Sequence, residues 1–376
     1  MNPKVSFIVP CYKLAHLLSE CVHSILAQSY QDHEILIMDD CSPDNTPEVA
    51  RSFNDPRVKH IRNEPNLGHL ANYNKGIGLA SGKYIWHISA DDSLRCPDLL
   101  QRYVDLMERH PNVGYAICPG VSISHGKDQG VLSYSVLGSA DAIFHGREFL
   151  LTLLERNRVI AAAGMVRREC YERHGVFPLD MPFGGDWYLW CLFAFHYDVG
   201  YLAEPMVNYR QHDLSMTNLL RTESERTLMR DDISLPWRIR KESERVGDFA
   251  FAARCIDFIV KQYVRGFLPK EWRNPDACLT VPEFESSLQA FTSSKSEQFQ
   301  LRARVFFEVG DHCYWDGDSV KALTFYRHSL RERFWTPSLW LKYLLLRMGR
   351  AGELVRQGSI PSFGWRKDHR SKPGNG

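Results

Sequence analysis

Strand and helix signals alternate along the first 120 residues, and this alternation constrains the fold more than any other feature. Short apolar runs predict four strands, at residues 5–10, 34–38, 57–61 and 83–89. Apolar residues at helical spacing predict three helices, at residues 14–26, 67–79 and 97–110. Strands separated by helices imply right-handed crossovers and a mostly parallel sheet covered on both faces. We therefore predict an α/β fold.

The remainder of the chain predicts a different organisation. Residues 119–140 lack periodicity and predict a long loop, and residues 143–209 return to mixed structure. The pattern is mainly helical from about Leu219, with three further helices expected at residues 302–314, 319–331 and 337–348. We expect a first domain over residues 1–217, a helical region over 218–366 and a disordered tail over 367–376.

Composition excludes several classes of protein. The 46 Lys and Arg residues balance 45 Asp and Glu residues, which argues against nucleic acid as the main partner. No apolar stretch approaches the roughly 18 residues of a membrane-spanning helix. The chain enters a strand-like segment directly after its first residues, so we expect no signal peptide. Ten scattered cysteines without a Cys-x-x-Cys pair favour reduced thiols in a cytoplasmic protein.

Polar side chains follow three of the predicted strands at the point where each strand ends. Tyr12 follows the first strand, Asp40 the second, and the pair Asp91-Asp92 the fourth. Because parallel strands end at the same edge of a sheet, and ligands bind there, these side chains are candidates for one site. Two adjacent acids are costly unless a cation compensates them, and their oxygens suit Mg²⁺ or Mn²⁺. Helix capping is the alternative for nearby Asp44 and Ser93.

Several segments resemble, in order and spacing, the family 2 glycosyltransferases. In the N-terminal half these segments are residues 5–13, 34–46, 66–68 and 82–93. The match continues through Arg167-Arg168-Glu169, Gly175-Val176-Phe177, Gly184-Gly185-Asp186-Trp187 and residues 209–215, and so covers roughly residues 1–217. The resemblance implies a GT-A fold, with a Rossmann-like nucleotide-binding sheet and an Asp-x-Asp-like motif, followed here by a helical C-terminal region.

The resemblance also implies roles for residues that would bind the donor nucleotide. Pro10 and Tyr12 would flank the base, and Asp40 would accept a hydrogen bond from it. Asn66 and Gly68 would shape the wall near the base and ribose. Two positions depart from the family pattern nearby. Cys41 stands where Gly is common and Lys13 where Asn is frequent, so the turn after the second strand is expected to differ locally.

Four further residues would carry the chemistry. By the same resemblance, Asp91 would contact the ribose or a metal-bound water, whereas Asp92 and His212 would hold a divalent metal, Mn²⁺ or Mg²⁺. Asp186 would be the catalytic base that takes the proton of the acceptor hydroxyl. A helix N-cap is the alternative for Asp186. The tryptophans that follow it, Trp187 and Trp190, belong either to an acceptor groove or to the core.

The function expected from these features is inverting, metal-dependent transfer of one sugar from a nucleotide-diphosphate sugar, with a UDP-sugar favoured. The acceptor hydroxyl would belong to a glycan, a lipid-linked intermediate, a protein or a small molecule, within surface-glycan or glycoconjugate biosynthesis. The chain lacks the Gln-x-x-Arg-Trp motif of processive synthases, which favours single addition. A catalytically silent nucleotide-sugar-binding scaffold is the alternative. An oxidoreductase is disfavoured because Gly76-Ile77-Gly78 precedes a strand, and a nucleotidyltransferase because residues 10–14 offer no Gly-rich loop.

Basic and apolar residues near the C-terminus suggest a further partner. The basic ones are Arg347, Arg350, Arg356, Arg366, Lys367 and Arg370, and the apolar ones Trp335, Trp340, Leu341, Tyr343 and Leu344. Together they predict a peripheral contact with the inner face of the cell membrane. A helical cap on the catalytic domain, or a homodimer contact with a solvated basic face, is the alternative.

Overall fold

The computed structural model describes residues 2–212, 215, 218, 225–268, 278–332 and 337–349. It divides into two compact units, Met1–Phe258 and Ile259–Gly376. The sequence predicted a domain boundary at residue 217. The first unit extends to residue 258 and therefore includes α9 (Glu225–Arg245). Some of the predictions lie outside the described residues. They concern the tail over 367–376, Asp213, Leu214, Trp335 and the basic residues from Arg350 onward.

An eight-stranded sheet forms the centre of the first unit, in the order β3-β2-β1-β4-β10-β6-β11-β9. The strands are β1 (Val5–Cys11), β2 (His33–Asp39), β3 (Val58–Arg62), β4 (Tyr84–His87), β6 (Val113–Ile117), β9 (Ala142–Phe144), β10 (Met165–Arg167) and β11 (Asp198–Tyr201). The first four run parallel, whereas β10 runs antiparallel to both of its neighbours. The predicted mostly parallel α/β sheet is thus confirmed.

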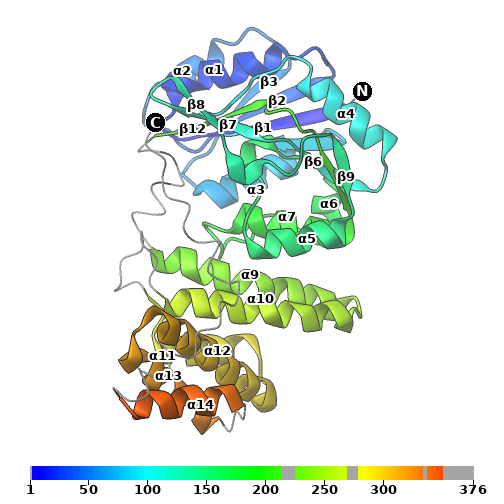
Figure 1. Ribbon diagram of the computed structural model, residues 1–376. Coiled ribbons are helices and arrows are strands. Elements are labelled where there is room, and N and C mark those ends of the chain that lie inside the picture. The colour runs from blue at the N-terminus through cyan, green and yellow to red at the C-terminus, as the bar shows by residue number, and fades with distance from the viewer. Residues whose placement is uncertain are drawn as a thin grey trace. The chain divides into compact units, whose positions relative to one another are not determined.

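Helices cover both faces of this sheet (Figure 1). Alternate residues of β1 point to opposite faces, so Phe7 lies in one core with α1 (Ala15–Leu26), α2 (Thr46–Arg51) and α4 (Leu99–Arg109). Ile8 lies in the other core, with α3 (His69–Leu79), α5 (Gly146–Glu155), α6 (Arg168–His174) and α7 (Gly185–His196). Burial of β1 and β2 on both sides explains why their sequences are continuously apolar.

A second, four-stranded sheet occupies part of the segment that the sequence predicted to be a long loop. Its order is β5-β12-β7-β8, for β5 (Ser93–Leu94), β12 (Val207–Gln211), β7 (Gly120–Ser124) and β8 (Lys127–Val131). The loop prediction is therefore wrong for residues 120–131. His125 and Gly126 both have positive φ, 49° and 70°, as a tight hairpin turn requires. The turn is formed by His-Gly and not by the Asn-Gly or Asp-Gly pair that signals a hairpin most clearly, so the sequence pattern did not reveal it.

Helices make up the described part of the second unit. The helix α10 (Phe249–Phe267) runs across the boundary, and α11 (Val281–Phe291), α12 (Lys295–Asp316), α13 (Ser319–Arg331) and α14 (Pro337–Arg347) follow. The three helices predicted at 302–314, 319–331 and 337–348 are confirmed, with α12 beginning seven residues earlier than predicted. Within the described residues, every helix is too short or too polar to cross a membrane.

Candidate functional site

The parallel strands bring the predicted donor residues to one edge of the large sheet. Cys11 pairs with Asp39 across β1 and β2, so Tyr12 and Asp40 each follow the end of a strand at the same level. Ile8 pairs with His87, which places Asp91 and Asp92 beyond the end of β4 at that edge too. The sequence prediction that these side chains share one edge is therefore confirmed.

Tyr73 of α3 marks the centre of the site, although the sequence analysis did not select it. Burial is the main cause that raises the pKa of its hydroxyl, and the charges of four carboxylates add to it. These carboxylates belong to Asp91, Asp186, Asp92 and Asp40. The strand-end acid groups and Asp186 therefore all act electrostatically on one buried phenol of α3. His69 and Tyr73, four residues apart on one helix face, were the available sequence signal.

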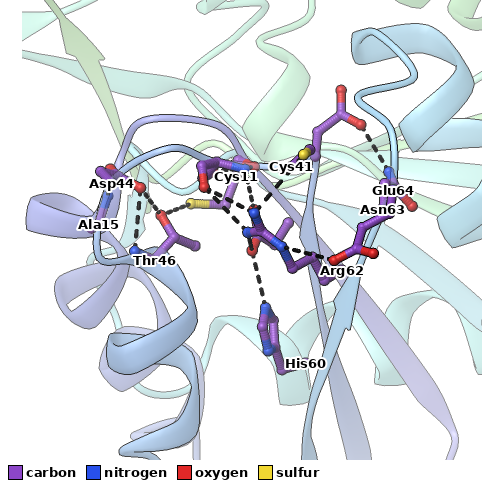
Figure 2. Close-up of polar contacts among 12 residues, drawn as sticks. Cys11, Ala15, Cys41, Asp44, Thr46, His60, Arg62, Asn63 and Glu64 are labelled. Atoms are coloured by element: carbon purple, nitrogen blue, oxygen red, sulfur yellow. Dashed lines mark hydrogen bonds and ion pairs between the residues drawn. The ribbon is translucent and has the colours of Figure 1, made fainter.

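Asp39 and Asp40 are adjacent but have different surroundings. Asp39 is completely buried, where Arg62 Nη1 donates to its Oδ2 at 2.6 Å and Ser42 N donates to its Oδ1 at 2.8 Å. Figure 2 shows the Arg62 side chain, from the end of β3, at the centre of these contacts near Cys41, with His60 beneath it. Burial alone would raise the pKa of Asp39, but these hydrogen bonds hold it below its usual range. Asp39 therefore stabilises the turn and is not available to a ligand.

Asp40 organises the wall that the sequence predicted for the base and ribose. Its carboxylate accepts hydrogen bonds from Asn63 Nδ2 at 2.8 Å, Leu67 N at 2.8 Å and Gly68 N at 3.0 Å. Asn66 Nδ2 donates to the Asp40 carbonyl at 2.6 Å. A carboxylate has about four acceptor positions, so roughly one remains for a ligand. Asp40, Asn66 and Gly68 thus form one preorganised unit.

The turn after β2 keeps a left-handed backbone without the residue that adopts it most easily. Cys41 has φ 60° and Lys13, in the facing turn after β1, has φ 59°. Each such residue costs about 1 kcal/mol relative to ordinary backbone conformations. The side chain of nearby Asp44 accepts from Ala15 N at 3.1 Å, a contact between two segments far apart in the sequence. The N-cap residues of α1 and α2 are Leu14 and Asn45, and Ser93 lies in β5, so the capping alternative is wrong for both Asp44 and Ser93.

The small second sheet holds the Asp91-Asp92 pair against the segment around residue 210. Arg210 N donates to Asp92 Oδ1 at 2.9 Å, and Arg210 Nε donates to the Asp91 carbonyl at 2.9 Å. His212 Nε2 lies 2.9 Å from Asp91 Oδ2. His212 thus approaches the acidic pair that the sequence associated with it, and its direct partner is Asp91. The role of Arg210 in this arrangement was not anticipated from the sequence.

The acidic pair has the properties of a site for a divalent cation. Both side chains are more than nine-tenths buried, and burial together with the charge of Asp91 raises the pKa of Asp92 well above its usual value. Asp91 Oδ1 is buried and has no hydrogen-bond partner among the described residues. Carboxylate oxygens beside an imidazole are ligands that suit Mn²⁺ or Mg²⁺. The chemistry of these side chains therefore suits such an ion, although Asp91, Asp92 and His212 do not bring three ligand atoms within 4.8 Å of one another in the described structure.

A second group of ligand atoms lies elsewhere in the first unit. His174, His196 and Glu242 are the one set of three potential ligands within 4.8 Å of one another in the described part of the chain. The two imidazole rings stack at 3.8 Å with planes 16° apart, so their in-plane lone pairs run side by side. Arg245 donates to both oxygens of Glu242. The arrangement is that of a packed ion-pair cluster rather than of a metal centre.

Asp186 lies in the first turn of α7, which begins one residue earlier after Gly184. Trp187 N donates to Asp186 Oδ1 at 2.6 Å. Burial raises the pKa of Asp186 to about 6, and that backbone hydrogen bond limits the rise. The N-cap position belongs to Gly184, so the capping alternative for Asp186 is wrong. A carboxyl with a pKa near neutrality can accept and release a proton at physiological pH.

The tryptophans after Asp186 are part of the core. Trp187 Nε1 donates to the Leu153 carbonyl at 2.8 Å, and Trp190 packs against Tyr115 with ring centroids 5.1 Å apart. Both side chains are more than nine-tenths buried. The core alternative is therefore confirmed over the acceptor groove for these two residues.

The helix α3 connects the donor wall to the segment that carries Asp186. It begins after Gly68, whose φ of 81° favours glycine. His69 Nε2 lies 2.9 Å from the Pro182 carbonyl. Asn74 exchanges two hydrogen bonds with the backbone of Phe177, at 2.8 and 3.0 Å. One rigid helix thus sets the distance between the predicted base wall and the predicted catalytic carboxylate.

Comparison with known proteins agrees with this arrangement. Residues 6–175 match the family model of glycosyl transferase family 2. The succinoglycan biosynthesis protein ExoO of Rhizobium meliloti is 38% identical over 103 residues, 27% of this chain and 29% of that protein. The glycosyltransferase GlyG of Streptococcus pneumoniae is 35% identical over 115 residues, 30% and 38% respectively. The matches span about a third of the length of these two relatives.

The fold is similar to a solved structure along almost the whole chain. The crystal structure of residues 1–349 of S. aureus TarS, in complex with UDP, superposes with a TM-score of 0.59 at 15% identity. The similarity covers 95% of this chain and 92% of that one. It therefore includes the helical C-terminal region, and the predicted GT-A fold class with such a region is confirmed.

Proposed function

We propose that this chain transfers a single sugar from a nucleotide-diphosphate sugar to an acceptor hydroxyl, with inversion at the anomeric carbon, because residues 6–175 match the family model of glycosyl transferase family 2. The observation that carries the proposal is that strand register brings Asp40 and the Asp91-Asp92 pair to one edge of the sheet, while His69 of α3 contacts Pro182 in the segment before Asp186. Such an arrangement separates a site for an anionic leaving group and its cation from a proton acceptor. Both are needed for an in-line displacement.

A UDP-sugar is the proposed donor. TarS, which has a similar fold, has been crystallised in complexes with UDP and with UDP-GlcNAc. In this chain Pro10 and Tyr12 would flank the base, and the free acceptor position of Asp40 would receive the N–H of a uracil. The Asp40–Asn66–Gly68 unit is already ordered by its own hydrogen bonds, which lowers the entropic cost of binding.

The chemical step follows from the position of each group. Asp186 would take the acceptor proton as that oxygen forms its bond to the anomeric carbon, while the bond from that carbon to the diphosphate oxygen breaks. A Mn²⁺ or Mg²⁺ ion at Asp91, Asp92 and His212 would stabilise the negative charge on the departing diphosphate. Arg210 would keep the acidic pair in place through its contacts with Asp92 and with the Asp91 carbonyl.

The proposed acceptor belongs to surface-glycan or glycoconjugate biosynthesis, as a glycan, a lipid-linked intermediate or a protein side chain. ExoO, named for succinoglycan biosynthesis, supports the first of these classes. A catalytically silent nucleotide-sugar-binding scaffold is the competing function. The presence of Asp92, Asp186 and His212 together favours the enzyme, because a scaffold needs neither a cation site nor a proton acceptor.

Nucleotide release from a panel of UDP-, GDP- and dTDP-sugars tests the proposed function. With Mn²⁺ or Mg²⁺ present, we expect slow hydrolysis of one UDP-sugar, and we expect EDTA to abolish it. Calorimetric titration with UDP accompanies the assay, because the natural acceptor is not required for nucleotide binding. Absence of both hydrolysis and UDP binding would reject the enzyme and its donor together. UDP binding with no turnover in acceptor-containing membrane extracts would favour the scaffold.

A peripheral membrane contact is proposed for the second unit. On α14 and directly after it, Leu341, Leu344 and Met348 lie on one face and are each more than half exposed. The helices α13 and α14 contain no Asp or Glu, and their basic residues are Lys321, Arg327, Arg331, Lys342 and Arg347. An apolar face on acid-free helices complements a bilayer of anionic lipids.

Vesicle sedimentation checks the membrane contact. We expect the wild-type chain to sediment with phosphatidylglycerol vesicles at low salt and not with phosphatidylcholine vesicles. The double variant Leu341→Glu/Leu344→Glu should lose most of this binding, because it places two charges on the apolar face. Phe249→Glu, at an exposed apolar residue of the first unit, is the matched control and should sediment like wild type. Equal sedimentation of the double variant and wild type would exclude this surface.

A further inference from the structure

A carboxylate on α9 holds the backbone immediately before Asp186. Asp231 Oδ2 accepts hydrogen bonds from Phe183 N at 2.9 Å and from Gly184 N at 3.0 Å. These two residues precede the first turn of α7, and Asp186 follows Gly184 by two positions. On the other side, His69 of α3 contacts the carbonyl of Pro182 at 2.9 Å. Three successive residues before the predicted catalytic base are thus fixed by side chains from two different helices.

The surroundings of Asp231 are unfavourable for a carboxylate that serves stability alone. Only 1% of the residue is exposed, and burial raises its pKa. Its second oxygen, Oδ1, is buried and finds no hydrogen-bond partner within the described part of the chain. An unsatisfied buried polar atom is destabilising, so the carboxylate carries a cost at Oδ1 besides the two amide hydrogen bonds that it makes through Oδ2. Such groups persist where they fix a geometry that function requires.

The loop also has no room to move toward α9. A Cβ atom added at Gly184 would lie 3.2 Å from Asp231 Cβ and 3.4 Å from Met181 Cε. The absence of a side chain therefore lets the loop backbone approach α9 closely enough for both amide hydrogen bonds. The glycine and the two hydrogen bonds thus act together to hold the loop against α9, although Asp231 and Gly184 lie 47 residues apart in the sequence.

We propose that Asp231 is a positioning residue of the transferase, which fixes the backbone of residues 183–184 so that the Asp186 carboxylate faces the attacking hydroxyl. The inference rests on the proposed function and deepens it. It gives α9, which the sequence placed beyond the catalytic domain, a direct part in organising the site. Displacement of a catalytic group by about 1 Å can reduce turnover about 100-fold.

Two substitutions at position 231 separate positioning from general stability. Asp231→Ala removes both acceptors, and we expect kcat to fall about 100-fold while the Kd for UDP stays within twofold. Asp231→Asn keeps an acceptor oxygen of the same shape and should retain kcat within about fivefold. The control is Ser243→Ala on the same helix, which removes the buried hydrogen bond from Ser243 Oγ to the Asp248 carbonyl and should leave kcat unchanged.

The pH profile provides a readout that a structural role would not move. Burial is what raises the pKa of Asp186, and the titratable groups that interact with it are Tyr73 and Cys191. A loosened loop admits water, so in Asp231→Ala the acidic limb of kcat/KM should shift from about pH 6 toward lower pH. If this variant does not fold, Gly184→Ala pushes the same loop away and should produce the same shift with a smaller loss of kcat.

Amide hydrogen exchange distinguishes failure of this inference from failure of the proposed function. Wild-type Phe183 and Gly184 amides should be protected, and Asp231→Ala should lose that protection at these positions. An active wild type whose Asp231→Ala variant keeps full kcat, or an equal loss of kcat in Ser243→Ala, would overturn the positioning role. Lost protection together with an inactive wild type on every donor would instead reject the proposed function, and the positioning role with it.

Discussion

Replacing Asp92 by Asn is expected to abolish sugar transfer while making the metal-free protein more stable. The loss of activity should be at least about 10³-fold, because a bound cation contributes several kcal/mol of charge stabilisation at the leaving group. The gain in stability has a separate cause. Burial and the neighbouring Asp91 raise the pKa of Asp92 well above its usual value, so its ionised form is costly in the fold. Asparagine keeps an oxygen that can accept from Arg210 N.

The sign of the pH dependence follows from that raised pKa. A carboxyl whose pKa is higher in the folded state contributes stability below the unfolded pKa of about 4, and this stability is lost as the pH rises. Thermal denaturation in EDTA should therefore show the wild type losing stability above about pH 4 more steeply than Asp92→Asn. Addition of Mn²⁺ should raise the Tm of the wild type only.

The matched control for this experiment is Asp98→Asn. Asp98 is an acid at the start of α4 with an exposed side chain, and it should alter neither turnover nor the effect of EDTA. Full turnover in Asp92→Asn, or a lower Tm than wild type without metal, would contradict the assignment of Asp92. Retained Mn²⁺ stabilisation in that variant would move the cation to other ligands.

Local sequence patterns were sufficient for the first half of the fold. The strands β1 and β2 are largely apolar because they are buried on both faces, whereas the edge strand β3 is only partly buried and has a weaker apolar pattern. The helices between the strands have one apolar side. The hairpin of β7 and β8 was missed because its turn uses His125 at positive φ in place of the usual Asn-Gly pair. Its exposed strand β8 also lacks the apolar alternation that identifies a half-buried strand.

Some residues of the candidate site could be predicted from local sequence patterns, and others could not. Asp40, Asp91 and Asp92 could be placed because each directly follows a strand, and strand order alone brings such residues to one edge. Tyr73 and Asp231 could not, because their importance depends on tertiary contacts. Asp231 reaches Gly184 across 47 residues, and Tyr73 acquires its position only when α3 packs beside four carboxylates. Local sequence patterns carry little signal for contacts between residues so far apart in the chain.

Replacing Asp186 by Asn is expected to reduce kcat by about 10²–10⁴-fold with the affinity for UDP unchanged. A positioned general base contributes an effect of this size, and the amide of asparagine cannot take the acceptor proton. The fold should be retained, since the Asn oxygen can still accept from Trp187 N. Burial raises the pKa of Asp186 to about 6, so in the wild type kcat/KM should rise with pH through about 6 and then level.

The free energy of unfolding should fall as Asp186 ionises, whereas kcat/KM should rise. Because the pKa of Asp186 is higher in the folded state, its contribution to stability is present below about pH 4 and is lost as the pH rises through about 6. Asp186→Asn should therefore be more stable than wild type above pH 6. Asp180→Asn, at an exposed acid six residues earlier that pairs with Arg238, is the control and should keep the wild-type pH profile. An unchanged acidic limb in an active Asp186→Asn enzyme would contradict this role and require a different proton acceptor on the acceptor side of the donor.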